Sequence, residues 1–190
     1  MSLRIIAGAW RGRKLAVPAG DSTRPTADRT RETLFSMLVS RLGTFDGLKL
    51  ADLFAGSGAL GLEALSRGGA SCLFVDSDPA AIKSLRANVA SLDASRQADI
   101  RASSAMALGI AKAPLDLVFL DPPYGSGAGE VAIDKLARLG WINQATWVCL
   151  ETAFDEVPNV RGFDVVADRK VGQARITLLR QAAPEPDPPG

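Results

Sequence analysis

The ten residues Asp52-Leu53-Phe54-Ala55-Gly56-Ser57-Gly58-Ala59-Leu60-Gly61 decide the fold. They join a predicted strand, Leu48–Phe54, to a predicted helix, Ala59–Arg67. Glycines at such a junction let the backbone approach a ligand, and the first turn of the helix offers N–H groups that have no partner within the helix. The stretch therefore predicts a ligand-binding loop after the first strand of a doubly wound α/β fold.

Beyond this loop, short apolar runs alternate with helical segments. The further predicted strands are Ser71–Asp76, Ala98–Ala102, Leu115–Asp121 and Thr146–Glu151. The further predicted helices are Pro79–Ser91 and Val131–Leu139, with a shorter one at Ala105–Ala111. This alternation predicts an α/β fold in which a parallel sheet carries helices on both faces.

An N-terminal extension precedes the alternation. Leu3–Ala7 and Lys14–Val17 lie on either side of a glycine-containing turn and predict a short hairpin. From Thr26 to Leu42, apolar residues recur at helical spacing, and they predict a helix that is capped by Thr26 or Asp28.

The C-terminal part differs again. Phe163–Arg169 and Arg175–Gln181 flank a turn and predict an antiparallel hairpin. The proline-rich end predicts a disordered tail. The expected organisation is a hairpin-and-helix extension over residues 1–43, a core over 44–181 that forms one globular unit with it, and the tail over 182–190.

Composition excludes several functions. No apolar run approaches the ~18 residues that a membrane span needs, and the start lacks the apolar region of a signal peptide. The chain has no histidine, which removes imidazole acid–base chemistry and histidine-ligated metals. Cys72 and Cys149 lie in apolar runs and are predicted to be buried thiols. We expect a cytoplasmic monomer with neither a metal nor a membrane as partner.

Charge is distributed unevenly along the chain. Residues 1–41 carry eight Lys and Arg against three Asp and Glu, whereas residues 42–190 carry 14 against 18. A basic segment on an acidic body indicates a polyanionic partner, although a solvated basic surface would have the same composition. The candidate contacts with that partner are Arg11, Arg13, Lys14, Arg24, Arg29 and Arg31.

The glycine loop is compatible with two cofactors. Its spacing matches the G-x-G-x-x-G of dinucleotide-binding folds, and Asp76, at the end of the second strand, could hold ribose hydroxyls in either case. Asp52 separates the two, since a carboxylate repels a pyrophosphate but pairs with an ammonium. S-adenosylmethionine has an ammonium, a ribose and no phosphate, so the acids favour it. The candidate cofactor contacts are Asp52, Phe54, Gly56, Ser57, Gly58, Asp76, Ser104 and Asp121.

Two polar residues near the loop need separate interpretation. Asp78 precedes Pro79 and is predicted to cap the next helix. Ser104 follows the third strand, where an acid that contacts the cofactor adenine would be expected. The adenine contact is therefore open.

A second motif, Asp121-Pro122-Pro123-Tyr124, follows the apolar run Leu117–Leu120. Open parallel sheets bind ligands at the carboxyl ends of their strands, so the motif is expected at the same edge as the glycine loop. The prolines fix the backbone and leave their carbonyls free, Asp121 adds a carboxylate, and Tyr124 offers a face for a base to stack on. Hydrogen-bond acceptors beside a stacking face suit an aromatic amine. The candidate catalytic residues are Asp121, Pro122, Pro123 and Tyr124.

The motif indicates methyl transfer to that amine. Acceptors around the N–H groups would favour a pyramidal nitrogen that can attack a methyl sulfonium. No strong general base is needed, because the methylated amine becomes acidic and Asp121 or water can take its proton. In-line positioning would supply most of the acceleration. The nucleotide must be unpaired or flipped, since a base inside a duplex could not reach the pocket.

Five segments of the chain stand in the order found in the RsmD-type family of bacterial 16S rRNA (guanine-N2)-methyltransferases, which the chain resembles from residue 4 to about 181. The segments are Arg4–Gly8, Arg11–Leu15, Arg24–Glu32, Asp52–Gly61 and Asp121–Tyr124. The glycine loop is shared with many methyltransferases, whereas the Arg-Pro-Thr segment is far more discriminating.

The resemblance implies a Rossmann-like class I methyltransferase with a seven-stranded sheet. It implies that the methyl group passes from S-adenosylmethionine to the 2-amino group of a guanine in 16S ribosomal RNA, on an assembled or assembling small subunit. It also implies residue roles: Asp52, Gly56 and Gly58 at the methionine end of the cofactor, Asp76 at its ribose, Asp121, Pro122 and Tyr124 at the target base, and Arg24–Arg31 near cofactor and RNA.

Three alternatives stay open. A carboxylate can accept the two adjacent donors of the guanine Watson–Crick edge together, but it can also hold the lone amine of adenine at N6. An NAD-dependent oxidoreductase is the enzymatic alternative outside methyl transfer. A non-catalytic RNA-binding assembly factor is the third.

Overall fold

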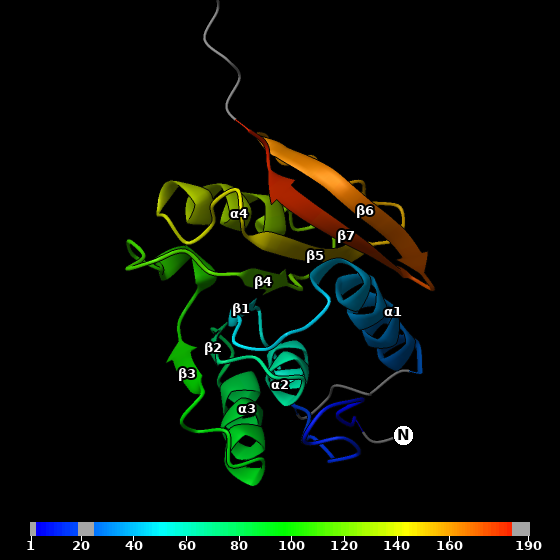
Figure 1. The fold of residues 1–190 in the computed structure, drawn as a ribbon, viewed down its shortest axis with the longest axis vertical. Coiled ribbons are helices and arrows are strands. Elements are labelled where there is room, and N and C mark those ends of the chain that lie inside the picture. Colours follow the sequence, from blue (N-terminus) through cyan, green and yellow to red (C-terminus); the bar gives the residue numbers. More distant parts are fainter. Residues whose placement is uncertain (1–2, 19–24, 184–190) are drawn as a thin grey trace, which may run out of the picture.

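The computed structural model describes residues 3–18 and 25–183. Its centre is a seven-stranded sheet with the strand order β3-β2-β1-β4-β5-β7-β6 (Figure 1). Strands β1 to β5 run parallel, and β7 and β6 add an antiparallel pair at one edge. The strands are β1 (Lys49–Leu53), β2 (Ser71–Asp76), β3 (Ala98–Ala102), β4 (Leu117–Leu120), β5 (Trp147–Ala153), β6 (Phe163–Val171) and β7 (Ala174–Gln181).

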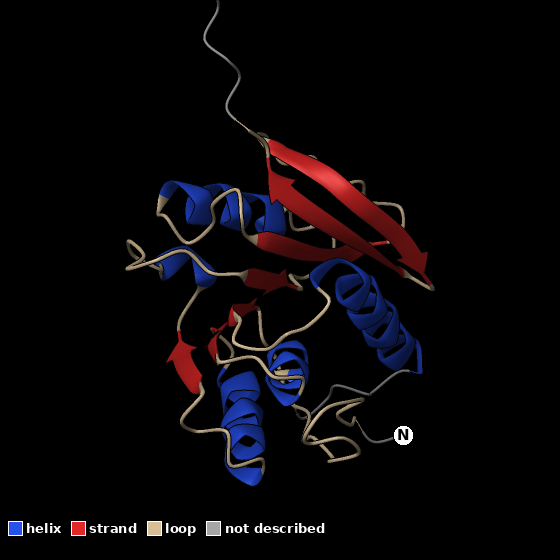
Figure 2. Cartoon of the chain, in the orientation of Figure 1, coloured by secondary structure: helices blue, strands red, loops and turns tan. Residues whose placement is uncertain are grey.

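Helices cover both faces of the sheet (Figure 2). They are α1 (Pro25–Leu42), α2 (Ala59–Ser66), α3 (Pro79–Ser91), α4 (Ala128–Arg138) and a 3-10 turn, η1 (Ala105–Ala107). Helices α1, α2 and α3 pack on the face that carries Phe74 and Phe119. Helix α4 and η1 pack on the face that carries Val75 and Leu120. The molecule is a three-layered α/β/α sandwich.

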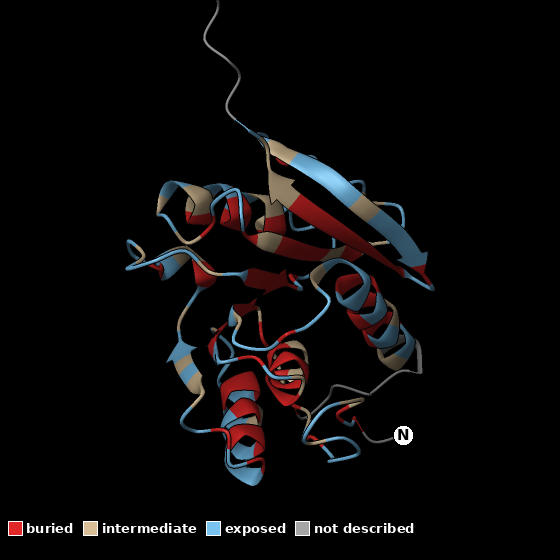
Figure 3. Cartoon of the chain, in the orientation of Figure 1, coloured by how far each residue is buried: buried red, intermediate tan, exposed pale blue. Residues whose placement is uncertain are grey.

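The core follows from the period of the strands. Successive side chains of a strand point to opposite faces, so a strand covered on both faces is apolar throughout. Strand β4 is buried at all four positions, and β1 at four of five (Figure 3). Cys72 and Cys149 are buried free thiols within this core, as predicted. Among the described residues, no helix is long and apolar enough to cross a membrane.

The predicted α/β architecture, with its seven-stranded sheet and C-terminal hairpin, is confirmed, with element boundaries shifted by at most three residues. Two local predictions are wrong. Helix α1 begins at Pro25, so Thr26 and Asp28 lie inside its first turn and neither is its cap. The helix predicted at Ala105–Ala111 is only η1, because Leu108 adopts an extended backbone and turns its side chain into the core.

The N-terminal hairpin is irregular and firmly docked. One antiparallel bridge joins Arg4 to Lys14, in place of two regular strands. The buried carboxylate of Glu63, on α2, accepts hydrogen bonds from the backbone N–H groups of Ile6 and Ala7 at 2.7 and 3.0 Å. Glu63 thus satisfies two backbone N–H groups that have no strand partner in the irregular hairpin. The two bonds also fix the basic segment to the body of the protein.

A second contact ties the hairpin to the glycine loop. Asn88, on α3, accepts from the N–H of Ala16 at 2.7 Å and donates to the Ala16 carbonyl at 2.9 Å. Its amide also donates to the carbonyl of Ser57 at 2.9 Å. One buried side chain therefore joins three segments that are far apart in the sequence.

Candidate active site

The glycine loop has the backbone that its sequence predicts. Phe54, Gly56 and Gly58 all have positive φ, at 63°, 55° and 79°. A positive φ is uncommon for a residue with a side chain, and such residues cluster at functional sites. A Cβ atom added to Gly56 would meet nothing within 4 Å, whereas one at Gly58 would lie 2.3 Å from Leu85 Cδ1. Gly56 therefore leaves its backbone open to a ligand, and Gly58 allows close packing.

Close packing also sets the position of α2. A Cβ atom on Gly61 would lie 2.4 Å from the Phe74 ring, so only glycine lets the helix approach β2 so closely. The N–H of Gly61 points to the carboxylate of Asp52, which accepts it at 2.8 Å. The acid at the end of β1 thus binds the first turn of the helix that follows the loop.

Asp52 is almost fully buried, at 1% exposure. Burial raises the pKa of its carboxyl to about 7; the Gly61 N–H opposes this rise and the nearby charge of Asp76 adds to it. Its Oδ2 accepts from the Gly61 N–H, so Oδ1 remains for a ligand at the loop. A cation at the loop would favour its ionised form, because an opposite charge lowers the pKa of a buried acid.

Asp76 connects the ends of β1 and β2. Its carboxylate accepts from the N–H of Gly56 and the N–H of Asp78, both at 2.8 Å. An ionised carboxylate has about four acceptor positions, so two remain for the hydroxyl groups of a ligand. Asp78 caps α3 through the N–H groups of Ala80 and Ala81, as predicted.

The loop suits S-adenosylmethionine better than a dinucleotide. Its open backbone at Gly56 lies between two carboxylates, Asp52 and Asp76, and residues 52–61 include no Lys or Arg that could neutralise a pyrophosphate. Ser104 is exposed and caps η1 by accepting from the N–H of Met106, so it provides no acid for an adenine. Within the described ranges, no group of three or more His, Cys, Asp or Glu side chains could hold a metal ion.

The Asp-Pro-Pro-Tyr motif lies beside the glycine loop. Leu53 and Leu120 are register partners at the ends of β1 and β4, and the N–H of Asp121 donates to the Leu53 carbonyl at 3.4 Å. Strand order reverses at this junction, which is where doubly wound folds bind their ligands. The two sequence motifs, 60 residues apart, therefore form one edge of the sheet.

The prediction of free proline carbonyls is wrong for Pro123. Its carbonyl accepts from both the N–H and the hydroxyl of Ser126, at 3.3 and 2.6 Å. Both lone pairs are used because the chain turns back toward α4 at this point. Pro122 is buried and packs close to Gly129 of α4, where a Cβ atom would lie 3.2 Å from its ring. Pro123 therefore shapes the turn.

The structure adds Glu151, which sequence reasoning left out of the site. Leu120 and Leu150 are register partners, and each is followed by an acid: Asp121 comes directly after β4, and Glu151 is the next residue of β5. The hydroxyl of Tyr124 donates to Glu151 Oε1 at 2.8 Å. A sequence signal existed, because Glu151 follows a buried apolar run as Asp121 does, but only the pairing of β4 with β5 places the two acids together.

This half of the edge crowds negative charge. The pKa of Asp121 is raised well above its ordinary value. The largest cause is desolvation by the surrounding protein, and the charges of Glu151 and Asp52 add to it. Burial likewise raises the pKa of Glu151, against the bond from Tyr124. Asp121 is an exposed residue, and the repulsion from Glu151 and Asp52 acts on its carboxyl in the same direction. Such acids are stabilised by any ligand that brings hydrogen-bond donors.

The predicted basic contacts separate into two groups. Arg11, Lys14 and Arg29 are exposed, and Arg13 is exposed but donates to the Ser91 carbonyl at the end of α3. Arg31 is only 6% exposed; it pairs with Asp28 at 2.8 Å and donates to the Arg4 carbonyl. Its Nη2 joins α1 to the hairpin, whereas its Nε and Nη1 have no hydrogen-bond partner in the described residues. A contact of Arg31 with a polyanion stays a prediction. Arg24 lies outside the described residues.

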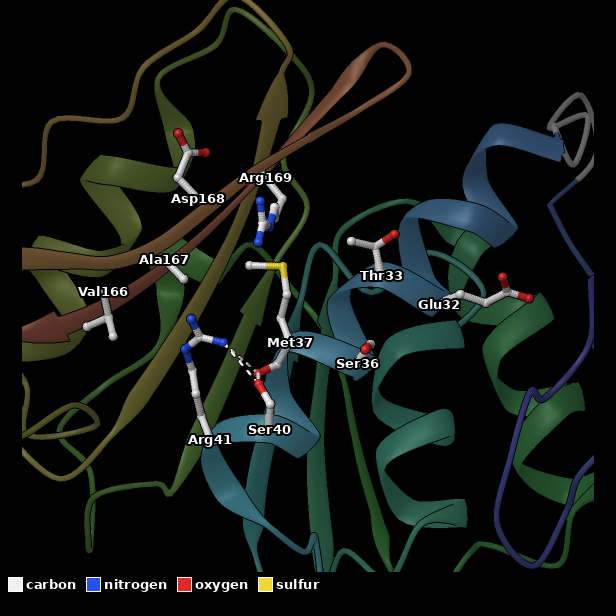
Figure 4. A pocket seen from close by; sticks show the side chains of 10 residues that line it. All are labelled: Glu32, Thr33, Ser36, Met37, Ser40, Arg41, Val166, Ala167, Asp168 and Arg169. Atoms are coloured by element: carbon white, nitrogen blue, oxygen red, sulfur yellow. Dashed lines mark hydrogen bonds between the residues drawn. The ribbon is translucent and has the colours of Figure 1, made fainter.

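A groove of about 710 Å³ lies elsewhere, between α1 and the edge strand β6 (Figure 4). Side chains of both elements line it, and one of them, Arg41, donates to the Met37 carbonyl at 3.0 Å. None of the predicted cofactor or catalytic residues belongs to it. The candidate site is the open edge at β1, β2, β4 and β5.

Comparison with known proteins gives a family. The model described as Conserved hypothetical protein 95 matches residues 3–180. Ribosomal RNA small subunit methyltransferase D of Escherichia coli (strain K12) is 37% identical over 183 residues, which are 95% of this chain and 91% of that protein. Putative rRNA methyltransferase YlbH of Bacillus subtilis (strain 168) is 43% identical over 173 residues, 88% of this chain and 92% of the relative.

Solved structures agree with these relatives. The putative methyltransferase yhhF from Escherichia coli has a TM-score of 0.82 at 35% identity, over 96% of this chain and 99% of that chain. Magnesium protoporphyrin IX methyltransferase from Synechocystis, solved with bound S-adenosylmethionine, shares the fold with a TM-score of 0.65 at 17% identity, over 86% and 87%. The chain belongs to the RsmD-type family of S-adenosylmethionine-dependent methyltransferases.

Proposed function

We propose that the protein methylates the exocyclic 2-amino group of a guanine in 16S ribosomal RNA, within the small ribosomal subunit or its assembly intermediate. Relatives named as small-subunit rRNA methyltransferases support the RNA substrate. One observation carries the reaction: Asp121 stands at the sheet edge beside the glycine loop, where its N–H donates to the carbonyl of Leu53, the residue after Asp52, at 3.4 Å.

The cofactor half of the site would hold S-adenosylmethionine by its ribose and its ammonium group. Asp76 would accept from the ribose hydroxyls with the positions that Gly56 and Asp78 leave free. Asp52 would face the ammonium group beside the open backbone of Gly56. Burial disfavours the negative charge of Asp52, and the positive charge of the ammonium would compensate for this. When bound, the cofactor supplies a methyl group on a sulfonium.

The other half holds the base. Asp121 accepts from the N–H groups of the target amine, and Tyr124, which is 48% exposed, offers its ring as a stacking face. The bound cofactor would supply its methyl group to the amine, and Asp121 or water would take the proton that the methylated amine loses. The raised pKa of Asp121 favours this proton transfer.

Guanine fits this arrangement because its Watson–Crick edge presents two adjacent donors, N1–H and the 2-amino group. One carboxylate can accept both hydrogen bonds. The nearby charge of Glu151 destabilises the ionised form of Asp121, and hydrogen-bond donors from the base would stabilise it. Adenine presents an acceptor beside its amine, and that acceptor would face the Asp121 oxygen. Methylation at adenine N6 is the second candidate, because Asp121 could still hold that amine alone.

The docked hairpin would contact the RNA backbone. Arg11 and Lys14 are exposed and have no side-chain partner in the parts of the chain that the structure describes. Contacts between cations and phosphates set the position and orientation of a nucleic acid on the protein. The hairpin, fixed by Glu63 and Asn88, would therefore orient the RNA toward the open edge.

The decisive test is mass spectrometry of 16S RNA nucleosides after incubation of the protein and S-adenosylmethionine with undermethylated 30S particles. We expect N2-methylguanosine from the wild-type protein and strongly reduced product from Asp121→Asn. Asp155→Asn, an exposed acid of the β5–β6 loop, is the matched control and should match wild type. Formation of N6-methyladenosine would select the second candidate, and absence of any methylated nucleoside would reject both.

A further inference from the structure

Tyr124 is the single tyrosine of the chain, and its side chain is hydrogen-bonded to a neighbouring strand. Its hydroxyl donates to Glu151 at 2.8 Å, although the two residues are 27 positions apart. The ring belongs to the loop after β4, whereas Glu151 is part of β5. The bond therefore ties a loop to the neighbouring strand at the edge where the target base would enter.

We propose that Glu151 is a positioning residue that fixes the ring of Tyr124 as the stacking face for the target base. The proposal rests on the proposed function. Glu151 itself does not need to touch the base, because it acts through the phenol hydroxyl. It limits rotation of the side chain, so less side-chain entropy is lost when a base stacks on the ring.

Glu151 and Tyr124 differ in the rigidity of the backbone that carries them, so the bond between them holds one residue in place more than the other. Glu151 lies in a strand that is paired on both sides, with β4 through Leu150 and with β7 through Ile176. Tyr124 precedes two glycines with positive φ, Gly125 and Gly127, in a loop without regular structure. The strand therefore serves as the fixed anchor and the loop as the part that is held.

Other acids face Tyr124 but do not replace Glu151. Asp121 and Glu156 act on the phenol only by their charge. Glu156 uses its carboxylate to accept from the N–H of Ala153 at 2.8 Å. Within the described ranges, Glu151 is the group that accepts the hydrogen bond of the phenol hydroxyl. Removal of Glu151 should therefore free the ring to rotate, whereas removal of Glu156 should not.

A substrate-free experiment tests the anchor. Tyrosine labelled with ¹³C at Cζ gives one resonance, and its titration up to the highest pH at which the protein stays folded reports the phenol pKa. Glu151→Ala and Glu151→Gln should lower that pKa by about one unit or more, since each removes a neighbouring negative charge. Glu156→Gln is the matched control and should lower it less. An unchanged titration in Glu151→Ala would show that the bond does not form and would overturn the proposal.

A double-mutant cycle tests the action on the substrate. Glu151→Ala should raise the half-saturating concentration of 30S particles about three- to tenfold, with a smaller change in the single-turnover rate at saturation, and Glu151→Gln should restore most of the loss because it keeps an acceptor oxygen. In a Tyr124→Phe background, Glu151→Ala should add nothing. An equal loss in both backgrounds would mean that Glu151 acts elsewhere and would sink the proposal, provided that thermal unfolding is unchanged.

The two experiments separate this proposal from the proposed function. If the wild-type protein methylates no rRNA, the proposed function fails, while the tyrosine resonance still shows whether Glu151 holds the ring. If methylation occurs and the cycle is additive, the proposed function stands and the positioning role fails.

Discussion

The acids in the two halves of the candidate site differ in their hydrogen-bond donors. In the cofactor half, Asp52 and Asp76 are bound by backbone N–H groups of the protein itself. In the base half, Asp121 and Glu151 stand side by side, and a phenol hydroxyl is the donor that the fold supplies to the pair. The first half is preorganised by the loop and the helix ends, whereas the second keeps acceptor capacity for donors that a substrate brings.

The largest effect is expected from Asp52. At pH 8, Asp52→Asn should weaken S-adenosylhomocysteine binding by about 1.5–3 kcal/mol, the scale of a hydrogen bond to a charged group. Asn keeps an acceptor for the Gly61 N–H, so the loop itself should survive. Isothermal titration measures the loss. An affinity equal to wild type would show that Asp52 serves only the helix.

The pKa of Asp52 gives this prediction a pH dependence with a definite sign. Because the pKa is about 7, the carboxyl is protonated at lower pH and cannot pair with an ammonium. Wild-type affinity should therefore rise with pH, by up to roughly tenfold per unit below pH 7, and then level off. Asp52→Asn should have no such slope, and 5′-methylthioadenosine, which lacks the ammonium, should show none with either protein.

The next effect is expected from Asp121. Asp121→Asn places a donor opposite the donors of the base, which should cost about 1–3 kcal/mol, chiefly in the single-turnover rate of methyl transfer. Affinity for S-adenosylhomocysteine should stay unchanged, because the proposed contacts with its aminoacid group and ribose come from Asp52 of β1 and Asp76 of β2. Full activity in a folded Asp121→Asn protein would contradict the proposed role of the base half.

Tyr124 should give a graded response. Tyr124→Ala removes a stacking face that contributes ~1–3 kcal/mol per base, whereas Tyr124→Phe keeps the face and should lose no more than the hydroxyl bond, about 0.5–1.5 kcal/mol. Both losses should appear in the half-saturating concentration of 30S particles. If Phe and Ala cost the same, the hydroxyl rather than the ring would be the functional part.

The smallest effect at physiological salt is expected from the exposed hairpin. Changing Arg11 and Lys14 to Gln should reduce the slope of log affinity for 30S particles against log salt by about 0.7–0.9 per lost phosphate contact. Cofactor affinity should be untouched. Lys112→Gln combined with Arg138→Gln, two exposed cations of the α4 side, is the control. An identical slope in the hairpin variant would make the basic segment a solvated surface.

Much of the architecture was predictable because local patterns agree with the fold. The apolar runs of the strands, the glycine spacing after β1 and the cap at Asp78 each indicate their element without knowledge of the rest. The two motifs of the site were predictable for the same reason, since each one sits at the end of a buried strand. Errors arose where a local signal was weak, as at the start of α1 and after Ala105.

The set of elements, the class of fold and the two motifs can be predicted from the sequence, because their signals lie within a few consecutive residues. Which polar residues meet depends on the tertiary packing. Glu63 and Asn88 read as ordinary helix residues, yet they hold the hairpin and the glycine loop. Arg31 reads as a surface cation, yet it is buried against Asp28. Glu151 joins Asp121 only because strand order places β5 beside β4, and a contact between distant segments leaves no mark on either segment alone.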